Sequence, residues 1–179
     1  YHPLLVFDGT TGDVLATVLR PGNNASSTGV MTILTRLVER LRKRWPRVKI
    51  IIRADGGFAS PALYKFCEKE HLGYVVGFMS TEPLKTLNKS NVERLYKRTG
   101  QKVRYLTSTL YHAKSWNKRR RILMKTEVSA EGTNQRFVVT NLRGRALMLY
   151  DFYGERGQVE NQMIKELKLA LQADRLSSR

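Results

Sequence analysis

Apolar positions in the first third of the chain follow strand spacing and helix spacing in turn. Residues 4–7 and 14–19 are two apolar runs around a turn rich in glycine and threonine, which predicts an antiparallel hairpin. Between residues 30 and 41 the apolar residues recur at helical spacing, until Pro46 ends the helix. A β-branched run at 48–52 then predicts a strand buried on both faces of a sheet.

The next elements complete a strand–helix–strand unit. Ser60 and Pro61 are typical of a helix N-terminus, and residues 74–78 form another apolar run. A strand, a helix and a second strand in this order join as a parallel pair within one sheet. We therefore expect an α/β fold, with a mixed sheet and flanking helices.

The middle of the chain interrupts this pattern. Residues 82–98 predict a polar helix, and three strand candidates with alternating apolar positions follow between residues 103 and 140. A long amphipathic helix is then predicted from about residue 149 to 171. We divide the chain into a first core part (1–80), a small antiparallel β insertion (81–145) and a last core helix (146–179).

The net charge of the chain indicates the kind of partner it binds. The chain of 179 residues carries 32 Lys and Arg against 15 Asp and Glu, a net charge of +17, which favours a nucleic acid over other partners. About two thirds of this excess lies in residues 81–145, so we interpret that segment as a basic DNA-binding module. In it, Trp116 lies among cations and either stacks on an unpaired base or anchors the insertion's own small core. The cationic candidates around it are Lys114, Lys118, Arg119, Arg120 and Arg121.

Several other classes of protein are excluded. Cys67 is the single cysteine, so neither a disulfide framework nor a cysteine-based zinc site fits, and a reducing compartment is expected. No apolar stretch approaches the ~18 residues of a membrane helix, and we find no secretory signal. A glycine-rich phosphate loop is absent, so no small-molecule cofactor is expected.

Two carboxylates are candidates for catalysis. Asp55 follows the β-branched strand, and Glu160 lies on the last helix, which can pack across the same sheet. Carboxylates brought together in this way are the ligands that Mg²⁺ or Mn²⁺ prefers, and two such ions can catalyse phosphoryl transfer. In the alternative interpretation Asp55 is a turn residue, Glu160 is solvated and pairs with Arg156, and Tyr153 belongs to the core.

Two motifs resemble those of bacterial insertion-sequence DDE transposases. The first, Arg53-Ala54-Asp55-Gly56-Gly57-Phe58, is similar to the second-aspartate motif of that family. The second, Asp151-Phe152-Tyr153-Gly154-Glu155-Arg156-Gly157-Gln158-Val159-Glu160-Asn161, is similar to its YREK signature. The stretches 1–9 and 19–23 also resemble this group. The resemblance covers almost the whole chain and implies an RNase H-like fold, with a β-rich insertion before the glutamate helix.

The resemblance assigns roles to individual residues. Asp55 and Glu160 correspond to two of three metal-ligating carboxylates, and Tyr153 and Arg156 correspond to residues that contact DNA phosphate. The signature lysine is expected at Leu167, and Lys168, one position further, is the candidate for its role. The family cuts transposon ends and joins them to target DNA with Mg²⁺ or Mn²⁺, two ions in the intact enzyme. It works as a homo-oligomer in a synaptic complex, in the bacterial cytoplasm at the nucleoid.

One part of the family pattern has no counterpart. The family's first aspartate lies on a strand with an Asp-Ala-Thr-Asp-Asp-like stretch, whereas we read the early carboxylates Asp8 and Asp13 as turn residues. The chain also begins at Tyr1 rather than Met. We therefore expect a fragment that is inactive alone, with an exposed sheet edge that a partner chain fills. The rival functions are a non-catalytic DNA-binding remnant on the same fold, and an RNase H-like nuclease or resolvase.

Overall fold

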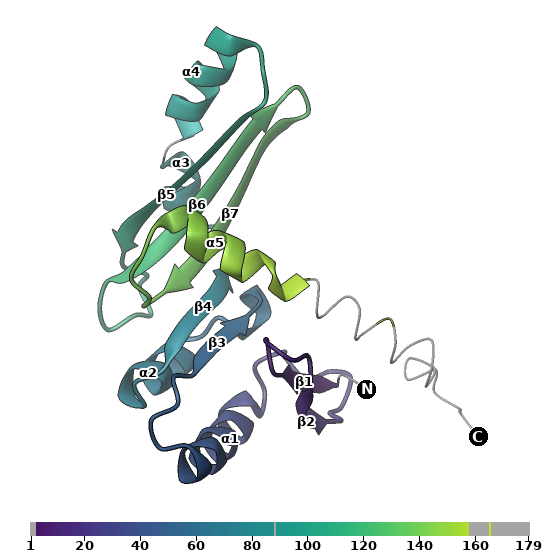
Figure 1. The fold of residues 1–179 in the computed structure, drawn as a ribbon. Coiled ribbons are helices and arrows are strands. Elements are labelled where there is room, and N and C mark those ends of the chain that lie inside the picture. Colours follow the sequence, from purple (N-terminus) through teal and green to yellow (C-terminus); the bar gives the residue numbers. More distant parts are fainter. Residues whose placement is uncertain (1–2, 88, 158–164, 166–179) are drawn as a thin grey trace, which may run out of the picture.

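A computed structural model describes residues 3–87, 89–157 and 165 of the chain. Its strands are β1 (Leu4–Phe7), β2 (Val14–Val18), β3 (Ile51–Ala54), β4 (Gly73–Phe78), β5 (Val103–Tyr111), β6 (Arg120–Ser129) and β7 (Gly132–Thr140). Its helices are α1 (Val30–Arg44), the 3₁₀ turn η1 (Gly56–Phe58), α2 (Pro61–Lys69), α3 (Glu82–Thr86), α4 (Lys89–Thr99) and α5 (Ala146–Gly154). The fold is α/β, as the sequence predicts, and is consistent with an RNase H-like core (Figure 1).

The strands form two separate sheets. β1 and β2 pair as the predicted antiparallel hairpin. The other five strands lie in the order β3-β4-β7-β6-β5, in which only β3 and β4 are parallel. The strands of the basic insertion therefore extend the core sheet, through the antiparallel pairing of β7 with β4. The division of the chain into three domains stays a prediction.

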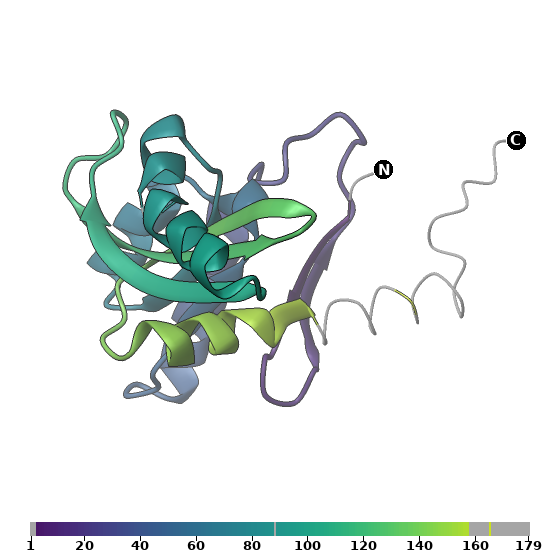
Figure 2. The same cartoon turned by 90° about the horizontal axis from the view of Figure 1, so that it is seen from above.

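Both faces of the central strands are buried, because their side chains alternate between two apolar clusters. Tyr74 and Val76 of β4 pack on one face with residues of α1, α2 and α3. Val75, between them, packs on the other face with Leu123, Val138 and Tyr150 of α5. Figure 2 shows α5 and α4 on opposite sides of the sheet. This second layer holds the start of the signature segment against the strands that carry the candidate site.

Most helix ends follow the sequence signals. The Ser60 side chain caps α2 by accepting a hydrogen bond from the Leu63 amide at 3.2 Å, with Pro61 in the first turn. The predicted helix at 82–98 is instead two helices, since the backbone of Leu87 is extended and ends α3. Every helix of the described residues is too short or too polar to cross a bilayer.

The strand at β3 differs from the prediction. It begins at Ile51 and lies at an edge of the five-stranded sheet, where Ile51 is 44% exposed, rather than being buried on both faces. The β1–β2 hairpin lies beside it without joining the sheet (Figure 1). β3 therefore has the composition of a central strand, but the backbone groups along one of its edges have no partner strand in the described part of the chain.

Candidate active site

Asp55 stands at the carboxyl end of β3, where the chain turns sharply into η1. Its Oδ1 accepts a hydrogen bond from the Gly57 amide at 2.9 Å, so the side chain caps the short 3₁₀ turn. The residue is exposed. One carboxylate oxygen serves the turn and the other is available to a ligand, so the structural and the catalytic interpretation of Asp55 are compatible.

Helix α5 brings Tyr153 to this turn. A Cβ placed on Gly77 of β4 would lie 2.6 Å from the Tyr153 hydroxyl, 2.8 Å from the Gly56 amide nitrogen and 3.2 Å from the Asp55 carbonyl carbon. The Tyr153 hydroxyl and the Asp55–Gly56 backbone therefore both pack against the Cα of Gly77, where a side chain would clash. Residues almost a hundred positions apart in the sequence therefore lie next to each other here.

Arg53 fixes this arrangement. Its guanidinium donates hydrogen bonds to the carbonyl oxygen of Phe152 at 2.8 Å and to Glu155 Oε2 at 3.3 Å, and it stacks on the Phe152 ring at 4.6 Å. It also donates to the carbonyl oxygen of Gly9, at 3.4 Å, in the β1–β2 turn. The side chain is only 11% exposed. One arginine thus joins the Asp55 strand, the signature helix and the hairpin.

Arg156 lies next to Tyr153. Its guanidinium carbon stands 5.0 Å from the centre of the Tyr153 ring, within the range of a cation–π contact. Tyr153 lies on α5, and Arg156 follows that helix and lines the same groove as Arg53 and Ala54 at the end of β3. A cation and a phenolic hydroxyl near an exposed carboxylate are groups that can bind a phosphodiester.

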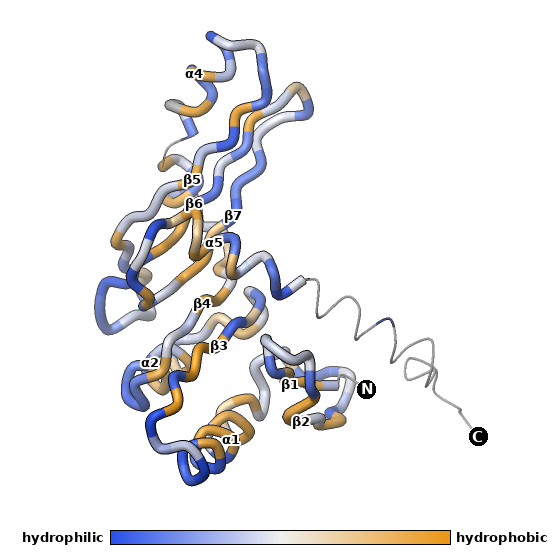
Figure 3. Tube along the Cα trace, viewed as in Figure 1, coloured by the Kyte–Doolittle hydropathy of each residue, from blue (hydrophilic) through white to orange (hydrophobic). Residues whose placement is uncertain are grey.

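An apolar groove separates the two sheets beside this site. It has a volume of about 210 Å³ and is lined by residues of β1, β3 and α1, together with Phe58 and Arg156. Figure 3 shows apolar stretches along α1 and β3. Because β1 and β3 each leave one edge unpaired there, the groove offers backbone hydrogen-bonding groups as well as apolar side chains.

The predicted metal ligands are only partly placed. Glu160 and Lys168 lie outside the described residues, so the convergence of Asp55 with Glu160 stays a prediction. Within residues 3–87, 89–157 and 165, no three His, Cys, Asp or Glu side chains gather closely enough to hold a metal ion. Asp55 offers one exposed carboxylate oxygen to such an ion.

Asp8 and Asp13 serve the hairpin turn. Asp8 Oδ1 accepts hydrogen bonds from the amides of Thr10 at 2.7 Å and Thr11 at 3.1 Å, and these bonds lower the pKa of the Asp8 carboxyl. Asp13 Oδ2 accepts a hydrogen bond from the Thr11 hydroxyl at 2.7 Å. Both contacts agree with their interpretation as turn residues.

The predicted DNA-binding residues of the insertion fall into two groups. Lys114, Lys118 and Arg119 are exposed. Arg121 is half-buried, and its guanidinium donates to the Ser108 hydroxyl and to the Leu142 carbonyl oxygen. The contact of these four residues with DNA stays a prediction.

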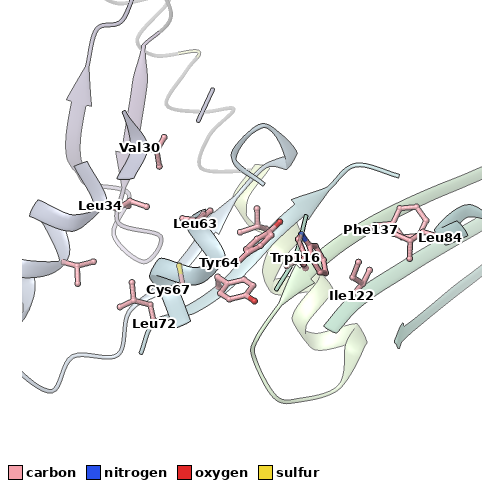
Figure 4. Close-up of a cluster of buried hydrophobic side chains, with 14 of the residues drawn as sticks. Val30, Leu34, Leu63, Tyr64, Cys67, Leu72, Leu84, Trp116, Ile122 and Phe137 are labelled. Carbon is pink, nitrogen blue, oxygen red and sulfur yellow. The ribbon is translucent and has the colours of Figure 1, made fainter. Parts of the chain in front are cut away.

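Trp116 and Arg120 must be corrected to structural residues. Trp116 is 5% exposed and packs against Tyr64, Phe78 and Tyr111, so its ring cannot stack on a base in this fold. Figure 4 shows Trp116 beside Tyr64 in the buried cluster. The core it anchors is the main core of the protein rather than one of the insertion's own. Arg120 is buried under the Tyr64 and Trp116 rings and pairs with Glu68.

Two residues of the site were not assigned a role from the sequence. Arg53 belongs to the Asp55 motif, but no local pattern signals its contact with the distant Phe152. Gly77 had a usable signal, because an isolated glycine within an apolar strand indicates close approach of another group. That group is the Tyr153 hydroxyl together with the Gly56 backbone.

We expect Gly77→Ala to destabilise the protein and to displace Tyr153. The added methyl group would overlap the Gly56 amide nitrogen, which belongs to the backbone and cannot move aside easily. Overpacking of this kind costs about 1–3 kcal/mol, which lowers Tm by roughly 2–4 °C per kcal/mol in a chain of this size. Thermal unfolding measures the effect. Gly154→Ala is the matched control, because a Cβ there has nothing within 4 Å; equal loss in both variants would contradict this packing.

Comparison with known families identifies the chain. The family model described as transposase DDE domain group 1 matches residues 1–179, the whole sequence. A search of curated proteins gave no significant match. Because this family model covers the whole sequence, the chain belongs to the DDE-domain transposases.

Proposed function

We propose that this chain is the catalytic core of a transposase that cuts and joins DNA, in the YREK-signature group of bacterial insertion sequences. The observation that supports this most is the meeting of the Tyr153 hydroxyl with the Asp55–Gly56 backbone over Gly77. Two motifs that match the family separately in the sequence are neighbours in space. A shared site explains this proximity, and the +17 charge suits a phosphodiester substrate.

Each residue of the candidate site has its own role in this proposal. Asp55, and Glu160 from the continuing signature segment, provide oxygen ligands for Mg²⁺ or Mn²⁺, one or two of which would polarise the scissile phosphate. Arg156 neutralises phosphate charge with a fork of N–H donors, and Tyr153 donates a hydrogen bond to a phosphate oxygen. Arg53 holds α5 against β3, so it positions both groups. Lys168 remains the candidate for the signature lysine.

This proposal needs a further carboxylate, and we propose the apolar groove as its position. A strand inserted between β1 and β3 would pair with both unpaired edges, bury Ile51 and join the two sheets into one. An aspartate on that strand would lie beside the end of β3 and so beside Asp55. We infer that the chain does not cleave DNA by itself and becomes active when this strand is supplied.

The intact enzyme would bind transposon ends and target DNA, as a homo-oligomer in the synaptic complex. Lys114, Lys118, Arg119 and Arg121 belong to a basic surface that suits DNA phosphates. A bacterial cytoplasmic enzyme at the nucleoid fits this substrate.

The test is metal-dependent strand cutting by a version of the protein that carries an Asp-Ala-Thr-Asp-Asp-like strand ahead of Tyr1. We expect nicking of end-sequence DNA with Mg²⁺ or Mn²⁺, followed by joining of the freed 3′-hydroxyl to target DNA. Binding without nicking would favour the non-catalytic remnant, and nicking without joining would favour a nuclease or resolvase. The unextended chain is the control and should not nick.

A further inference from the structure

A second concave surface lies at the other end of the five-stranded sheet. It is formed by the first residues of β6, the last residues of β7, the loop at 141–144 and the start of β4. Five cationic side chains and one carboxylate line it, namely Lys118, Arg119, Arg120, Arg121, Arg143 and Glu68. We call this surface the basic pocket.

The basic pocket is distinct from the Asp55 site. On β4, Tyr74 lines the pocket, whereas Gly77, three residues further, lies under the Asp55–Gly56 turn. Three residues of a strand span about 10 Å. The β5–β6 loop of the pocket and the end of β3 also point to opposite ends of the sheet in Figure 1. A group bound in the pocket is therefore not the group that reacts at Asp55.

The floor of the pocket is rigid. The Asn141 side chain accepts a hydrogen bond from the Tyr74 amide at 2.8 Å and donates one to the Leu72 carbonyl oxygen at 2.8 Å. The buried Thr140 hydroxyl donates to the Tyr74 carbonyl oxygen at 2.7 Å, and the Leu142 amide donates to that hydroxyl at 3.0 Å. These bonds fix the loop that carries Arg143, so the pocket is formed before any ligand arrives.

The single carboxylate in the pocket does not repel an anion. Glu68 receives two hydrogen bonds from Arg120 at 2.9 and 3.0 Å, one from the Tyr74 hydroxyl at 3.0 Å, and an ion pair with Lys118 at 3.0 Å. Two cations therefore surround this one anion. Among the described residues, Arg119 and Arg143 take part in no ion pair, and both are exposed at the rim.

We propose that the basic pocket is a phosphate-binding subsite for the DNA backbone, separate from the catalytic centre. Arg119 and Arg143 provide the contacting guanidinium groups, and Arg121, held by Ser108 and Leu142, gives a fixed positive charge beneath them. A DNA strand engaged here and at Asp55 would run along the sheet from one end to the other. This subsite rests on the proposed function, since it deepens how that substrate is held.

The test is equilibrium binding of a short labelled DNA duplex to the chain itself, without divalent metal, over a range of salt concentrations. In Arg119→Gln/Arg143→Gln the slope of log K against log salt should fall by about 1.8, because each phosphate contact contributes about 0.9. Affinity near 0.1 M salt should fall by roughly tenfold for each lost contact. Lys97→Gln/Arg98→Gln on α4 is the control, with the same charge change at exposed positions far from the pocket.

A second measurement does not depend on substitutions. Modification of arginines by an arginine-specific reagent, read by mass spectrometry, should show Arg119 and Arg143 protected by duplex DNA and Arg98 unprotected. Equal weakening in both double variants, or equal protection of Arg98, would overturn the pocket. Absence of any duplex binding at low salt would overturn it too. The transposase proposal is judged separately, by metal-dependent cutting at the Asp55 site.

Discussion

Replacing Asp55 with Asn should abolish DNA cutting in the protein that carries the additional strand, and leave DNA binding nearly unchanged. A metal ion contributes several kcal/mol to the stabilisation of charge in a transition state, so loss of its ligand should slow cutting by roughly 1,000-fold or more. Asn keeps a side-chain oxygen that can accept the Gly57 amide hydrogen bond. The turn therefore survives, which is the advantage of Asn over Ala at this position.

Glu160→Gln should have the same effect, because we assign Glu160 to the same metal site. Cutting rate and duplex affinity are measured on each variant, with Mg²⁺ and with Mn²⁺. Asp13→Asn is the matched control, since Asp13 lies in the hairpin turn, where it accepts a hydrogen bond from Thr11. Full cutting by Asp55→Asn would remove Asp55 from the mechanism, and loss of cutting in Asp13→Asn would mean that an early carboxylate takes part.

Elements with strong local signals were predicted well. The hairpin, α1, α2 with its Ser60 cap, and β4 all lie within a few residues of their predicted positions. Their signals, which are turn residues, helical spacing and a capping side chain, act over a few neighbouring residues. The Asp55 turn was found in the same way, because a strand followed by Asp-Gly-Gly is a local pattern.

Features that depend on long-range pairing were missed or misread. β7 joins β4 through partners such as Thr140 and Val75, and no local signal reveals that the insertion continues the core sheet. Whether β3 lies at the edge of the sheet depends on which strands pair with it. Its β-branched composition indicates only that its surroundings are apolar.

Trp116 and Arg120 show how charge can mislead a sequence-based interpretation. Both stand in a run of cations, which predicts exposure. Arg120 has the same strand parity as Ile122 and Met124, which face the main core, so its side chain is directed inward. The alternation of side chains along the strand indicates that Arg120 faces inward. The many charges around it suggest exposure instead, and this suggestion is wrong.

The buried pair of Arg120 and Glu68 leads to the second large expected effect. Glu68→Gln should destabilise the protein by about 3 kcal/mol, because it leaves the Arg120 guanidinium buried without a counter-charge. The Arg120 side chain is 2% exposed and that of Glu68 17%. In a chain of this size the loss corresponds to a fall in Tm of roughly 6–12 °C. Thermal or denaturant unfolding at neutral pH measures it.

The pH dependence of this difference gives an independent check. Burial raises the pKa of the Glu68 carboxyl, but hydrogen bonds from Arg120, Lys118 and Tyr74 outweigh burial and hold the pKa below its ordinary value of 4.5. A carboxyl with a lowered folded-state pKa stabilises the fold above the unfolded-state pKa and loses this effect as pH falls through the folded value. The stability gap between the wild type and Glu68→Gln should therefore be full at neutral pH and close below pH 4.5.

Glu70→Gln is the matched control, with the same substitution two residues further along. Its ion pair with Arg42 is about one third exposed on both sides, and pairs of that kind contribute about 1 kcal/mol or less. Arg120→Met combined with Glu68→Gln should be less destabilised than the two single variants predict together, because it removes the unpaired charge. If Glu68→Gln lost no more stability than Glu70→Gln, or if its deficit persisted unchanged in acid, Arg120 would not depend on Glu68 for its counter-charge.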